Sequence, residues 1–454
     1  MDEIKRTAKG RPLWAILELY HLRKREWKTL KTVCVVEGFT GSGKTTYLLN
    51  YFRGKNVFYF SFAGFEEKLA KRLFAERVAE KTGLVVTEWE DSFKAVSGKY
   101  RYILLDDLAS LSSYKRFRKA FYDYMITNIY TRPFVALIRQ PTEDLGGLAD
   151  DYVVTGLDYF SLPEVMKLFP TLSKADTLGL CAMSGGIPKI LHEYDGSSNF
   201  EDNLRRMLEP SSAFMRFMPE LLMRYFRKPE NYHHILCAIA NGNHSVSGIG
   251  KYTGFAYNKC DNYLSGLISC GFVKTEKVLS KKGAEKTVYE LTNSYFRLWH
   301  KYVYLNQTGI QLGNQKLVDG IIQKITDEEI HEFHLQKAFA LANERIHWDL
   351  WDSFQISKNV PRAPETVSKG KFRYTFDAIA RNGEKAVFIK VFADPLENCK
   401  EEALYKLRKA VMIANKYYDS HILIFSKRRF SDYAVAEAAK DETISLIEVD
   451  RLKY

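Results

Sequence analysis

The stretch GFTGSGKT, residues Gly38–Thr45, decides the fold of the N-terminal part of this chain. A short apolar run rich in β-branched residues, Val33–Val36, precedes it and predicts a buried strand. A helical pattern of apolar residues begins at Tyr47. The stretch therefore matches G-x-x-x-x-G-K-[ST] between a predicted strand and a predicted helix, which is the setting of a phosphate-binding loop.

Each part of this loop has a chemical role. Glycines let backbone N–H groups turn inward around phosphates, and the N-terminus of the following helix favours an anion. Lys44 is long enough to reach the β- and γ-phosphates, and the hydroxyl of Thr45 is a ligand for Mg²⁺. We therefore expect ATP with Mg²⁺ to bind here, with a catalytic role for Lys44. The predicted nucleotide contacts of the loop are Gly38, Phe39, Thr40, Gly41, Ser42, Gly43, Lys44, Thr45 and Thr46.

A second acidic motif is expected on another strand, and YRYILLDD, residues Tyr100–Asp107, supplies it. Asp106 is placed to hold Mg²⁺, and Asp107 is placed to polarise the attacking water as a general base. Many nucleoside triphosphatases have Glu at the second position, so the shorter Asp predicts slow turnover. The alternative interpretation is a buried strand that ends in a helix-capping acid.

Strands and helical stretches alternate through this part of the chain. The alternation predicts an α/β fold with a doubly wound, mostly parallel sheet. Arg139 and Gln140 follow one of the strands, where they either sense the γ-phosphate or belong to a surface loop. The further predicted strands are Asn56–Phe62, Phe134–Ile138 and Tyr152–Val154, and the predicted helices are Glu66–Lys81 and Tyr114–Ile129.

From about Asn231 the pattern changes to three short helices and two strands, which is typical of a winged helix-turn-helix. The third helix of such modules often enters the DNA major groove, and here it offers Asn258, Lys259 and Asn262. Over Glu230–Leu291, seven lysines minus five acids leave a charge of only +2, which is weak for phosphate contacts. A protein-interaction module therefore remains as an alternative.

The C-terminal part predicts a small mixed sheet from the strands Phe372–Ala380, Lys385–Phe392 and His421–Phe425, with the helix Glu401–Tyr417 between the last two. Asp377 and Lys390 occupy two positions of a nuclease motif in which two acids bind a metal and a lysine activates water. Phe388 stands where the second acid belongs. A structural Asp at a hairpin is therefore the favoured interpretation, with metal-dependent cleavage as the alternative.

Composition and charge limit the classes of protein to which the chain can belong. The chain has 454 residues, 46% hydrophobic and 27% charged, as in an ordinary globular protein of roughly two to four domains. A net charge of +12 favours acidic partners or is simply a basic surface. No stretch approaches the roughly 18 consecutive apolar residues of a membrane helix, and no secretion signal is visible. The six cysteines form no C-x-x-C pair, so we expect a cytoplasmic protein without a metal cluster.

The order of these motifs along the chain resembles that of a prokaryotic AAA-type ATPase family of archaeal type, which is related to the signal-transduction (STAND) ATPases. The resemblance covers nearly the whole chain and implies four domains: 1–160, a P-loop ATPase core; 161–228, a helical lid; 229–295, a winged helix; and 296–454, an inactive PD-(D/E)XK nuclease-like domain. It also implies nucleotide contacts for Arg11, which lies in an N-terminal G-R motif, and for Pro188, which lies in the G-x-P motif Gly185–Pro188 of the lid. The acids that usually follow the G-R motif are absent, and Asp107 stands where the family usually has Glu.

Three functional hypotheses follow. In the first, the chain is an ATP-hydrolysing switch that couples its nucleotide state to the winged helix and the C-terminal domain. In the second, it is a DNA-binding protein in which ATP is regulatory and hydrolysis is slight. An active nuclease is a third and less favoured hypothesis. DNA or a protein is the expected partner, and the sequence determines neither the oligomeric state nor an arginine finger.

Overall fold

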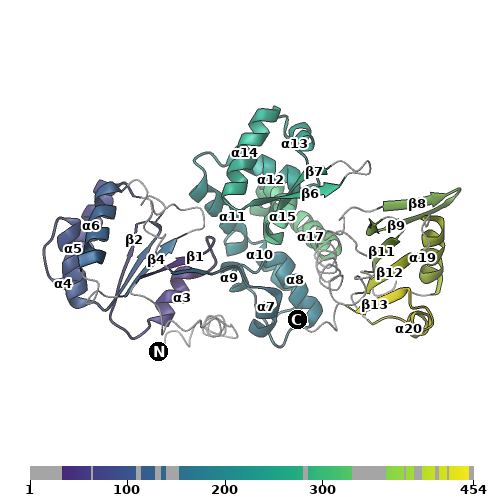
Figure 1. Cartoon of the computed structure of the whole chain (residues 1–454), viewed down its shortest axis with the longest axis horizontal. Coiled ribbons are helices and arrows are strands. Elements are labelled where there is room, and N and C mark those ends of the chain that lie inside the picture. The colour runs from purple at the N-terminus through teal and green to yellow at the C-terminus, as the bar shows by residue number, and fades with distance from the viewer. Residues whose placement is uncertain are drawn as a thin grey trace. The chain divides into compact units, whose positions relative to one another are not determined.

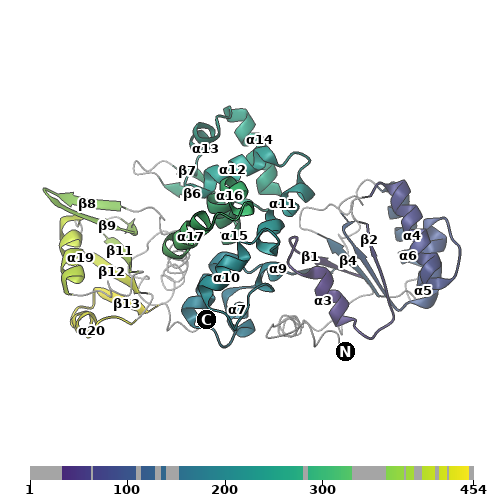
Figure 2. The ribbon, with the colours of Figure 1, turned by 180° about the vertical axis from the view of Figure 1, so that it is seen from behind.

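The computed structural model describes residues 33–62, 65–108, 114–127, 134–139, 153–279, 285–329, 365–382, 385–392, 401–414, 419–426 and 429–448. The chain divides into two compact units, which can be followed from opposite sides in Figure 1 and Figure 2. The first unit comprises Met1–Thr171, Ser184–Tyr232 and Asn262–Phe272, and the second comprises Leu172–Met183, His233–Asp261 and Val273–Tyr454. The finer division into four domains remains a prediction.

A five-stranded sheet forms the centre of the first unit. Its order is β2-β3-β4-β1-β5, and every neighbouring pair is parallel. This confirms the predicted α/β fold with a parallel sheet. It also places β1, which leads into the loop at Gly38, between two neighbours. The strands are β1 (Val33–Glu37), β2 (Val57–Ser61), β3 (Tyr102–Asp106), β4 (Phe134–Arg139) and β5 (Val153–Gly156).

Helices cover both faces of this sheet: α4–α6 lie together on one face and α3 lies on the other (Figure 1, Figure 2). The sequence predicts α3, α4 and α6 but not α5. The buried face of α5 nevertheless shows helical spacing, with Trp89, Phe93 and Val96 buried. The helices are α3 (Lys44–Tyr51), α4 (Glu67–Thr82), α5 (Trp89–Lys99) and α6 (Lys115–Thr127).

Aromatic side chains fill the space between the sheet and α4–α6. On β2, Phe58 and Phe60 are buried in this core, and the alternating residues Tyr59 and Ser61 are only half-buried. Since side chains alternate across a strand, Tyr59 and Ser61 point away from the core. The other large core residues include Phe62, Phe74, Trp89, Phe93, Phe117 and Phe121.

Short helices follow the sheet. α11 has a proline in its interior, Pro219, and the side chains of Phe214, Met218 and Leu222 are fully buried. The region predicted as the lid is therefore helical, and its role as a lid remains a prediction. Its helices are α7 (Leu162–Leu168), α8 (Lys174–Ser184), α9 (Pro188–Leu191), α10 (Phe200–Met207) and α11 (Ala213–Tyr225).

The three helices and two strands expected for a winged helix are present. β6 and β7 pair antiparallel, with Val273 opposite Leu291. Helical turns continue afterwards, including a π-helical turn over Trp299–Val303. The elements are α12 (Glu230–Ala240), α13 (Val246–Thr253), α14 (Tyr257–Ser269), β6 (Val273–Leu279), β7 (Glu285–Leu291), α15 (Ser294–Leu298), α16 (Gln307–Gln311) and α17 (Gln315–Lys324).

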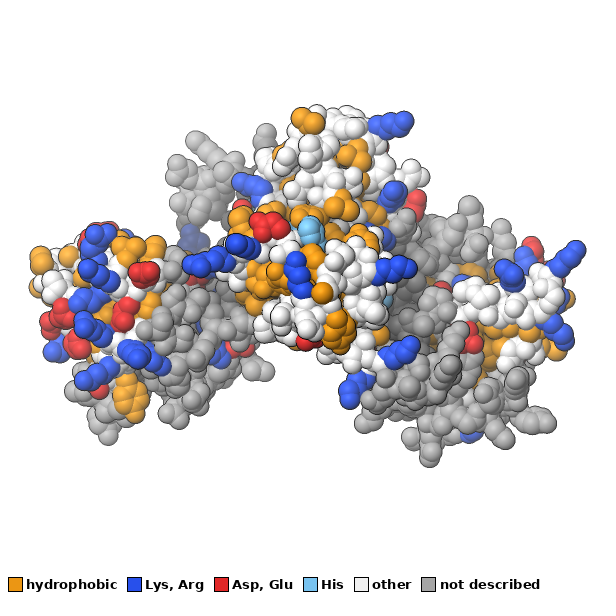
Figure 3. Space-filling model, turned by 90° about the horizontal axis from the view of Figure 1, so that it is seen from above, with side chains coloured by type: hydrophobic (Ala, Val, Ile, Leu, Met, Phe, Trp, Pro, Cys, Tyr) orange, Lys and Arg blue, Asp and Glu red, His pale blue; other side chains and the backbone are white. Residues whose placement is uncertain are grey.

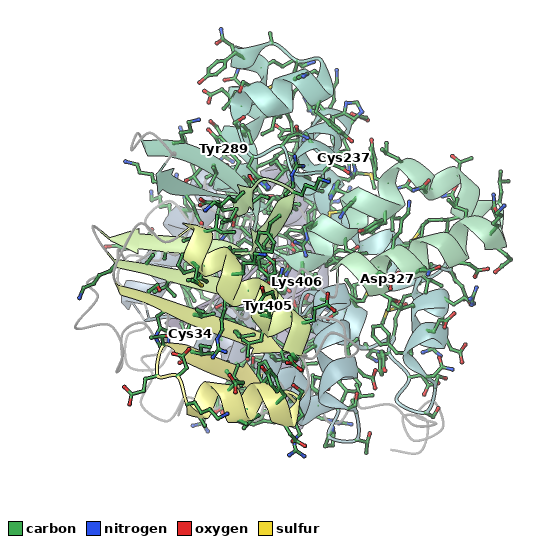
Figure 4. The ribbon with its side chains drawn as sticks, turned by 90° about the vertical axis from the view of Figure 1, so that its right-hand side faces the viewer. Cys34, Cys237, Tyr289, Asp327, Tyr405 and Lys406 are labelled. Atoms are coloured by element: carbon green, nitrogen blue, oxygen red, sulfur yellow. The ribbon has the colours of Figure 1, made fainter. Side chains whose placement is uncertain are left out.

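The C-terminal part contains the predicted mixed sheet, of order β10-β11-β12-β13. The β10–β11 pair is antiparallel, and the two following pairs are parallel. α19 lies over this sheet, and Figure 4 labels Tyr405 and Lys406 on it. The elements are β10 (Ala378–Asn382), β11 (Lys385–Phe392), α19 (Glu401–Ala414), β12 (Asp419–Ser426), α20 (Asp432–Ala439) and β13 (Ile444–Glu448).

The prediction of a single strand over Phe372–Ala380 is wrong, because the chain forms two strands here, one before and one after Asp377. β9 (Phe372–Phe376) pairs with β8 (Glu365–Lys369), whereas β10 pairs with β11. The chain therefore passes from one sheet to another at this residue. The residue pattern of this stretch does not show such a change of pairing partner, which depends on contacts distant in sequence.

Candidate functional site

The loop between β1 and α3 requires glycine at three positions. Gly41 and Gly43 have positive φ angles of 83° and 84°, a region that other residues rarely adopt. Gly38 is constrained differently, since a Cβ atom there would collide with the carbonyl oxygen of Leu157. These glycines let the backbone curve into the shape that a phosphate-binding loop needs.

Lys44 is the first residue of α3, and its side chain folds back over this loop. Its Nζ donates hydrogen bonds to the carbonyl oxygens of Gly38 at 2.6 Å and Phe39 at 3.0 Å. The residue is only 9% exposed, so a charged amine is held in place by backbone acceptors. A cation is thereby positioned over the loop, as the predicted contact with phosphate requires.

Thr45 and Asp106 lie together, although they come from different motifs. The hydroxyl of Thr45 donates a hydrogen bond to Asp106 Oδ2, and the hydroxyl of Tyr59 donates to the same oxygen at 3.2 Å. Asp106 is 5% exposed. Burial raises the pKa of this carboxyl, while the hydrogen bond from Thr45 and the charge of Lys44 act in the opposite direction. A hydroxyl and a carboxylate are oxygen ligands of the kind that Mg²⁺ prefers.

Asp107 has an unusual backbone conformation, and its carboxylate has several protein contacts. Its φ of 55° is the only positive value at a non-glycine residue among those that the structure describes. Ser61 Oγ donates to Asp107 Oδ2 at 2.6 Å, and Arg224 of α11 forms an ion pair with Oδ1. Both carboxylate oxygens therefore have protein partners. The alternative of a helix-capping acid involves residues after Leu108, which lie outside the described part of the chain.

These groups surround one cavity of about 620 Å³, which is within the usual range for a small-molecule site. Three residues of the loop, Gly38, Phe39 and Ser42, do not line it, and Arg11 lies outside the described residues. The structure thus brings most of the predicted site residues to a single place. Those that line the cavity are Thr40, Gly41, Gly43, Lys44, Thr45, Thr46, Asp106, Asp107 and Pro188.

Further cavity residues come from the helices after the sheet and from β2, and no motif of the sequence indicates them. Tyr59 and Ser61 have the alternation of a strand, but their contacts with the two acids depend on how β2 pairs with β3. Arg224 lies near the end of an amphipathic helix, where a basic residue is ordinary. The lining residues outside the predicted set include Tyr59, Lys189, His192, Glu193 and Arg224.

Arg139, one of the two residues considered as a γ-phosphate sensor, lines the cavity. Its guanidinium pairs with Glu37 at 2.8 Å, and Glu37 directly precedes the predicted phosphate-binding loop. The pair therefore links the ends of the neighbouring strands β4 and β1. Gln140 lies outside the described residues.

The Gly185–Pro188 segment is more than a simple turn. Gly186 has a φ of 74°, and a Cβ atom there would collide with the carbonyl oxygen of Phe160. The amide of Phe160 donates to the carbonyl of Gly186 at 2.8 Å. This close backbone contact fixes the start of α9, where Pro188 occupies a first-turn position and lines the cavity.

In the C-terminal sheet, Asp377 is engaged in structural contacts. Its carboxylate accepts the amide of Val391 at 2.8 Å and pairs with Lys390 at 3.3 Å. Phe388 is 1% exposed and belongs to the core beneath α19. No group of three or more potential metal-ligating side chains occurs among the described residues. These contacts favour the structural interpretation of Asp377.

Positive and negative side chains are mixed on the described surface of the first unit. On the helices α4–α6, basic and acidic side chains are interspersed (Figure 3), as the ion pairs Lys71–Glu88 and Arg77–Glu80 show. On α14, Asn258, Lys259 and Asn262 are exposed. In the part of the chain that the structure describes, no helix has the length and apolar character needed to cross a membrane.

Comparison with known proteins gives distant similarities. No family model matches the chain. An uncharacterized protein of Methanocaldococcus jannaschii is 24% identical over 273 residues. That match covers 58% of this chain and 58% of the relative, so the chain spans a little over half the length of the curated relative that it matches.

Several solved structures are similar to the chain at low sequence identity. The Walker-type ATPase of Pyrococcus abyssi matches with a TM-score of 0.44 and 14% identity, over 62% of this chain and 94% of that one. The Orc1 protein of Aeropyrum pernix in complex with DNA matches with a TM-score of 0.30 and 14% identity, over 70% and 93%. A STAND protein of Pyrococcus horikoshii with a tetratricopeptide repeat sensor matches with a TM-score of 0.26 and 14% identity, over 70% and 49%. Because all three TM-scores lie below 0.5, the nucleotide site is inferred from its own geometry.

Proposed function

We propose that this chain binds ATP with Mg²⁺ and hydrolyses it, and that its nucleotide state controls its winged-helix and C-terminal parts. One observation carries the proposal. Lys44, Thr45 and Asp106, which two separate motifs supply, line the same cavity at the carboxyl ends of parallel strands. Ligands of open α/β sheets bind at such strand ends.

The residues present fit both ATP and Mg²⁺. Two glycines with positive φ angles, Gly41 and Gly43, shape the loop for phosphate, and Lys44 supplies a cation over it. Thr45 and Asp106 are the oxygen ligands that would hold Mg²⁺. When bound, this ion neutralises charge on the β- and γ-phosphates.

Asp107 is the proposed general base. To act, a carboxylate oxygen must accept the proton of a water molecule that attacks the γ-phosphate. In the structure, Ser61 and Arg224 occupy both oxygens of Asp107. This occupation, together with the shorter side chain of Asp, supports the prediction of slow turnover.

The proposed switch uses the four-part organisation predicted from the sequence. ATP binding closes a helical lid, residues 161–228, over the core, and the change is passed to the winged helix and the C-terminal domain. Nucleotide-dependent ordering and domain closure are common routes for such coupling. Pro188 and Arg11 are the proposed contacts of the lid and of the N-terminal segment with the nucleotide.

The second candidate is a DNA-binding protein with regulatory ATP binding. The exposed side chains of Asn258, Lys259 and Asn262 on α14 favour it. The test is retention of the protein on DNA at increasing salt concentration. Electrostatic binding requires retention to fall steeply as salt rises, so flat retention removes the basis of this candidate.

The proposed function is tested by measuring ATP binding and ATP hydrolysis side by side for wild type, Lys44→Ala and Lys94→Ala. Lys94 is an exposed lysine of α5 and serves as the matched control. We expect wild type and Lys94→Ala to bind and hydrolyse ATP, and Lys44→Ala to lose both activities. Binding without turnover in wild type would support the regulatory candidate. Absence of nucleotide binding in wild type would refute the proposal.

A further inference from the structure

Tyr59 places a phenol hydroxyl beside Asp106 from the outer strand of the five-stranded sheet. β2 stands at one end of the strand order and pairs with β3, where Tyr59 lies opposite Leu104. Residues two apart on a strand share a face, so Asp106 points to the same side as Leu104 and Tyr59. Phe58 and Phe60 point to the other side, into the aromatic core. The pairing of β2 with β3 therefore puts the phenol on the side of the cavity, which Tyr59 lines.

The carboxylate of Asp106 is held from three directions. The backbone amide of Asp107 donates to Oδ1 at 2.8 Å. The hydroxyl groups of Thr45 and Tyr59 both donate to Oδ2. Three of the roughly four lone-pair sites of a carboxylate are therefore engaged by the protein, and they fix the plane of the carboxylate before any ligand binds.

Tyr59 differs from the other hydroxyl donor because it is not itself a proposed metal ligand. The oxygen of Thr45 is proposed to bind Mg²⁺, so its contact with Asp106 belongs to the part of the site that changes when the ion binds. The phenol of Tyr59 only donates to the ligand. Groups that hydrogen-bond to a metal ligand orient it, and their loss typically lowers metal affinity by roughly 10- to 100-fold.

We infer that Tyr59 is a positioning residue that fixes the carboxylate of Asp106 for a small octahedral cation, and that it thereby gives the site a preference for Mg²⁺ over Ca²⁺. Mg²⁺ requires nearly ideal octahedral geometry, whereas Ca²⁺ accepts more oxygens in flexible arrangements. A carboxylate with a fixed plane therefore favours Mg²⁺, and a carboxylate that is free to rotate favours it less. The inference rests on the proposed function and adds a residue that selects the metal by acting through Asp106.

The first test uses Tyr59→Phe, which keeps the ring and removes only the hydroxyl. Calorimetric titration of the non-hydrolysable analogue AMPPNP, at a series of Mg²⁺ or Ca²⁺ concentrations, gives the metal concentration that produces half of the gain in affinity. This concentration is expected to rise by about tenfold for Mg²⁺ and by only about twofold for Ca²⁺. AMPPNP affinity without metal is expected to stay unchanged, because the proposed role of Tyr59 is exerted on the metal ligand.

Tyr122→Phe is the matched control, since Tyr122 is a tyrosine of α6 that is 55% exposed and does not line the cavity. It should keep the wild-type response to both metals. Equal rises for Mg²⁺ and Ca²⁺ in Tyr59→Phe overturn the inference, because a general loss of structure does not distinguish the two ions. Weaker AMPPNP binding without metal also contradicts it, since Tyr59 would then contact the nucleotide directly.

The second test is a double-mutant cycle with Asp106→Glu. This change keeps a carboxylate but carries it further from the strand by one methylene, so the phenol of Tyr59 no longer meets it in the same position. Removal of the hydroxyl in this background is expected to change the ratio of the Mg²⁺ and Ca²⁺ concentrations several-fold less than in wild type. Equal changes in both backgrounds mean that Tyr59 does not act through Asp106.

The outcomes separate this inference from the proposed function. If wild type binds no AMPPNP with or without metal, the proposed function fails and the inference fails with it. If Mg²⁺ strengthens AMPPNP binding equally in wild type and Tyr59→Phe, only the role of Tyr59 fails. Circular dichroism of each variant checks that the helices remain folded, and retained metal-free AMPPNP binding in Tyr59→Phe shows that the predicted phosphate-binding loop is intact.

Discussion

The hydroxyl of Thr45 donates a hydrogen bond to the carboxylate of Asp106, although 61 residues separate them in the chain. Thr45 belongs to the first turn of α3, and Asp106 ends β3. Between β1 and β3 in the sheet lies β4, so the contact depends on the complete parallel arrangement. Two motifs that are recognisable separately therefore bring together one pair of proposed oxygen ligands for Mg²⁺.

Thr45→Ala is expected to remove most of the effect of Mg²⁺ on ATP affinity, because one of the two oxygen ligands is lost. The expected loss is on the order of tenfold in the ratio of affinities with and without Mg²⁺. Calorimetric titration of ATP in both conditions measures this ratio. Thr45→Ser keeps the hydroxyl and serves as the control, so an equal loss in both variants contradicts the assignment.

Asp106→Asn is expected to stabilise the nucleotide-free protein at neutral pH. Burial raises the pKa of Asp106, so the folded state binds more protons than the unfolded state between the two pKa values. The stability contributed by the protonated carboxyl is therefore fully present at low pH and is lost as pH rises through the folded pKa. Thermal unfolding midpoints without Mg²⁺ should show an advantage of Asp106→Asn at neutral pH that shrinks toward about pH 4. Asp91→Asn, at an exposed position, should show no such trend.

Gly186→Ala is expected to destabilise the protein by about 2 kcal/mol or more, since a left-handed backbone and a collision with the carbonyl of Phe160 combine. Denaturant unfolding followed by circular dichroism measures the change. Gly196→Ala is the control, because a Cβ atom there meets nothing within 4 Å. Similar midpoints for the two variants are incompatible with the tight contact at Gly186.

A buried histidine pair in the second unit predicts loss of stability in mild acid. His233 Nδ1 and His300 Nε2 lie 3.1 Å apart, and burial lowers the pKa of His233 to about 4 and that of His300 to about 3. Both folded pKa values lie below the ordinary histidine value of 6.5, so the folded state binds fewer protons. Stability is therefore full above pH 6.5 and falls as pH drops toward 4, by up to about 1.4 kcal/mol per pH unit for each imidazole.

His233→Gln tests this relationship, since it removes one of the two titrating groups. Thermal unfolding at decreasing pH should show a shallower loss of stability than in wild type, even if the variant is less stable at neutral pH. An exposed histidine outside the pair provides the control His244→Gln, which should keep the wild-type slope. Equal slopes in all three proteins would mean that the pair does not control the acid response.

Asp377→Ala is expected to lower stability by roughly 1–3 kcal/mol, because the amide of Val391 and the amine of Lys390 lose their acceptor. Wild type is expected to show no Mg²⁺-dependent nicking of DNA, since Phe388 replaces an acid. Asp432→Ala changes a carboxylate that is 96% exposed and should have little effect on stability. Nicking by wild type that Asp377→Ala abolishes would restore the nuclease hypothesis.

Some features of this protein can be predicted from the sequence alone because they depend on local order. The loop Gly38–Thr45 needs a strand before it, a helix after it and glycines between, and all three are contiguous in the chain. The strand that ends at Asp106 is likewise a local apolar run followed by acids. Side-chain alternation and helical periodicity therefore predict the parallel α/β sheet and the main candidate ligands.

Only the tertiary structure decides which partners these residues meet. Ser61 and Arg224 occupy the two oxygens of Asp107, and Gly186 contacts the backbone of Phe160, through pairings far apart in sequence. Strand order and helix packing set these contacts, and neither is encoded in a short window of residues. The sequence by itself thus predicted the kind of site, and tertiary packing decided that its proposed base lies paired with an arginine of α11, a helix that no motif indicates.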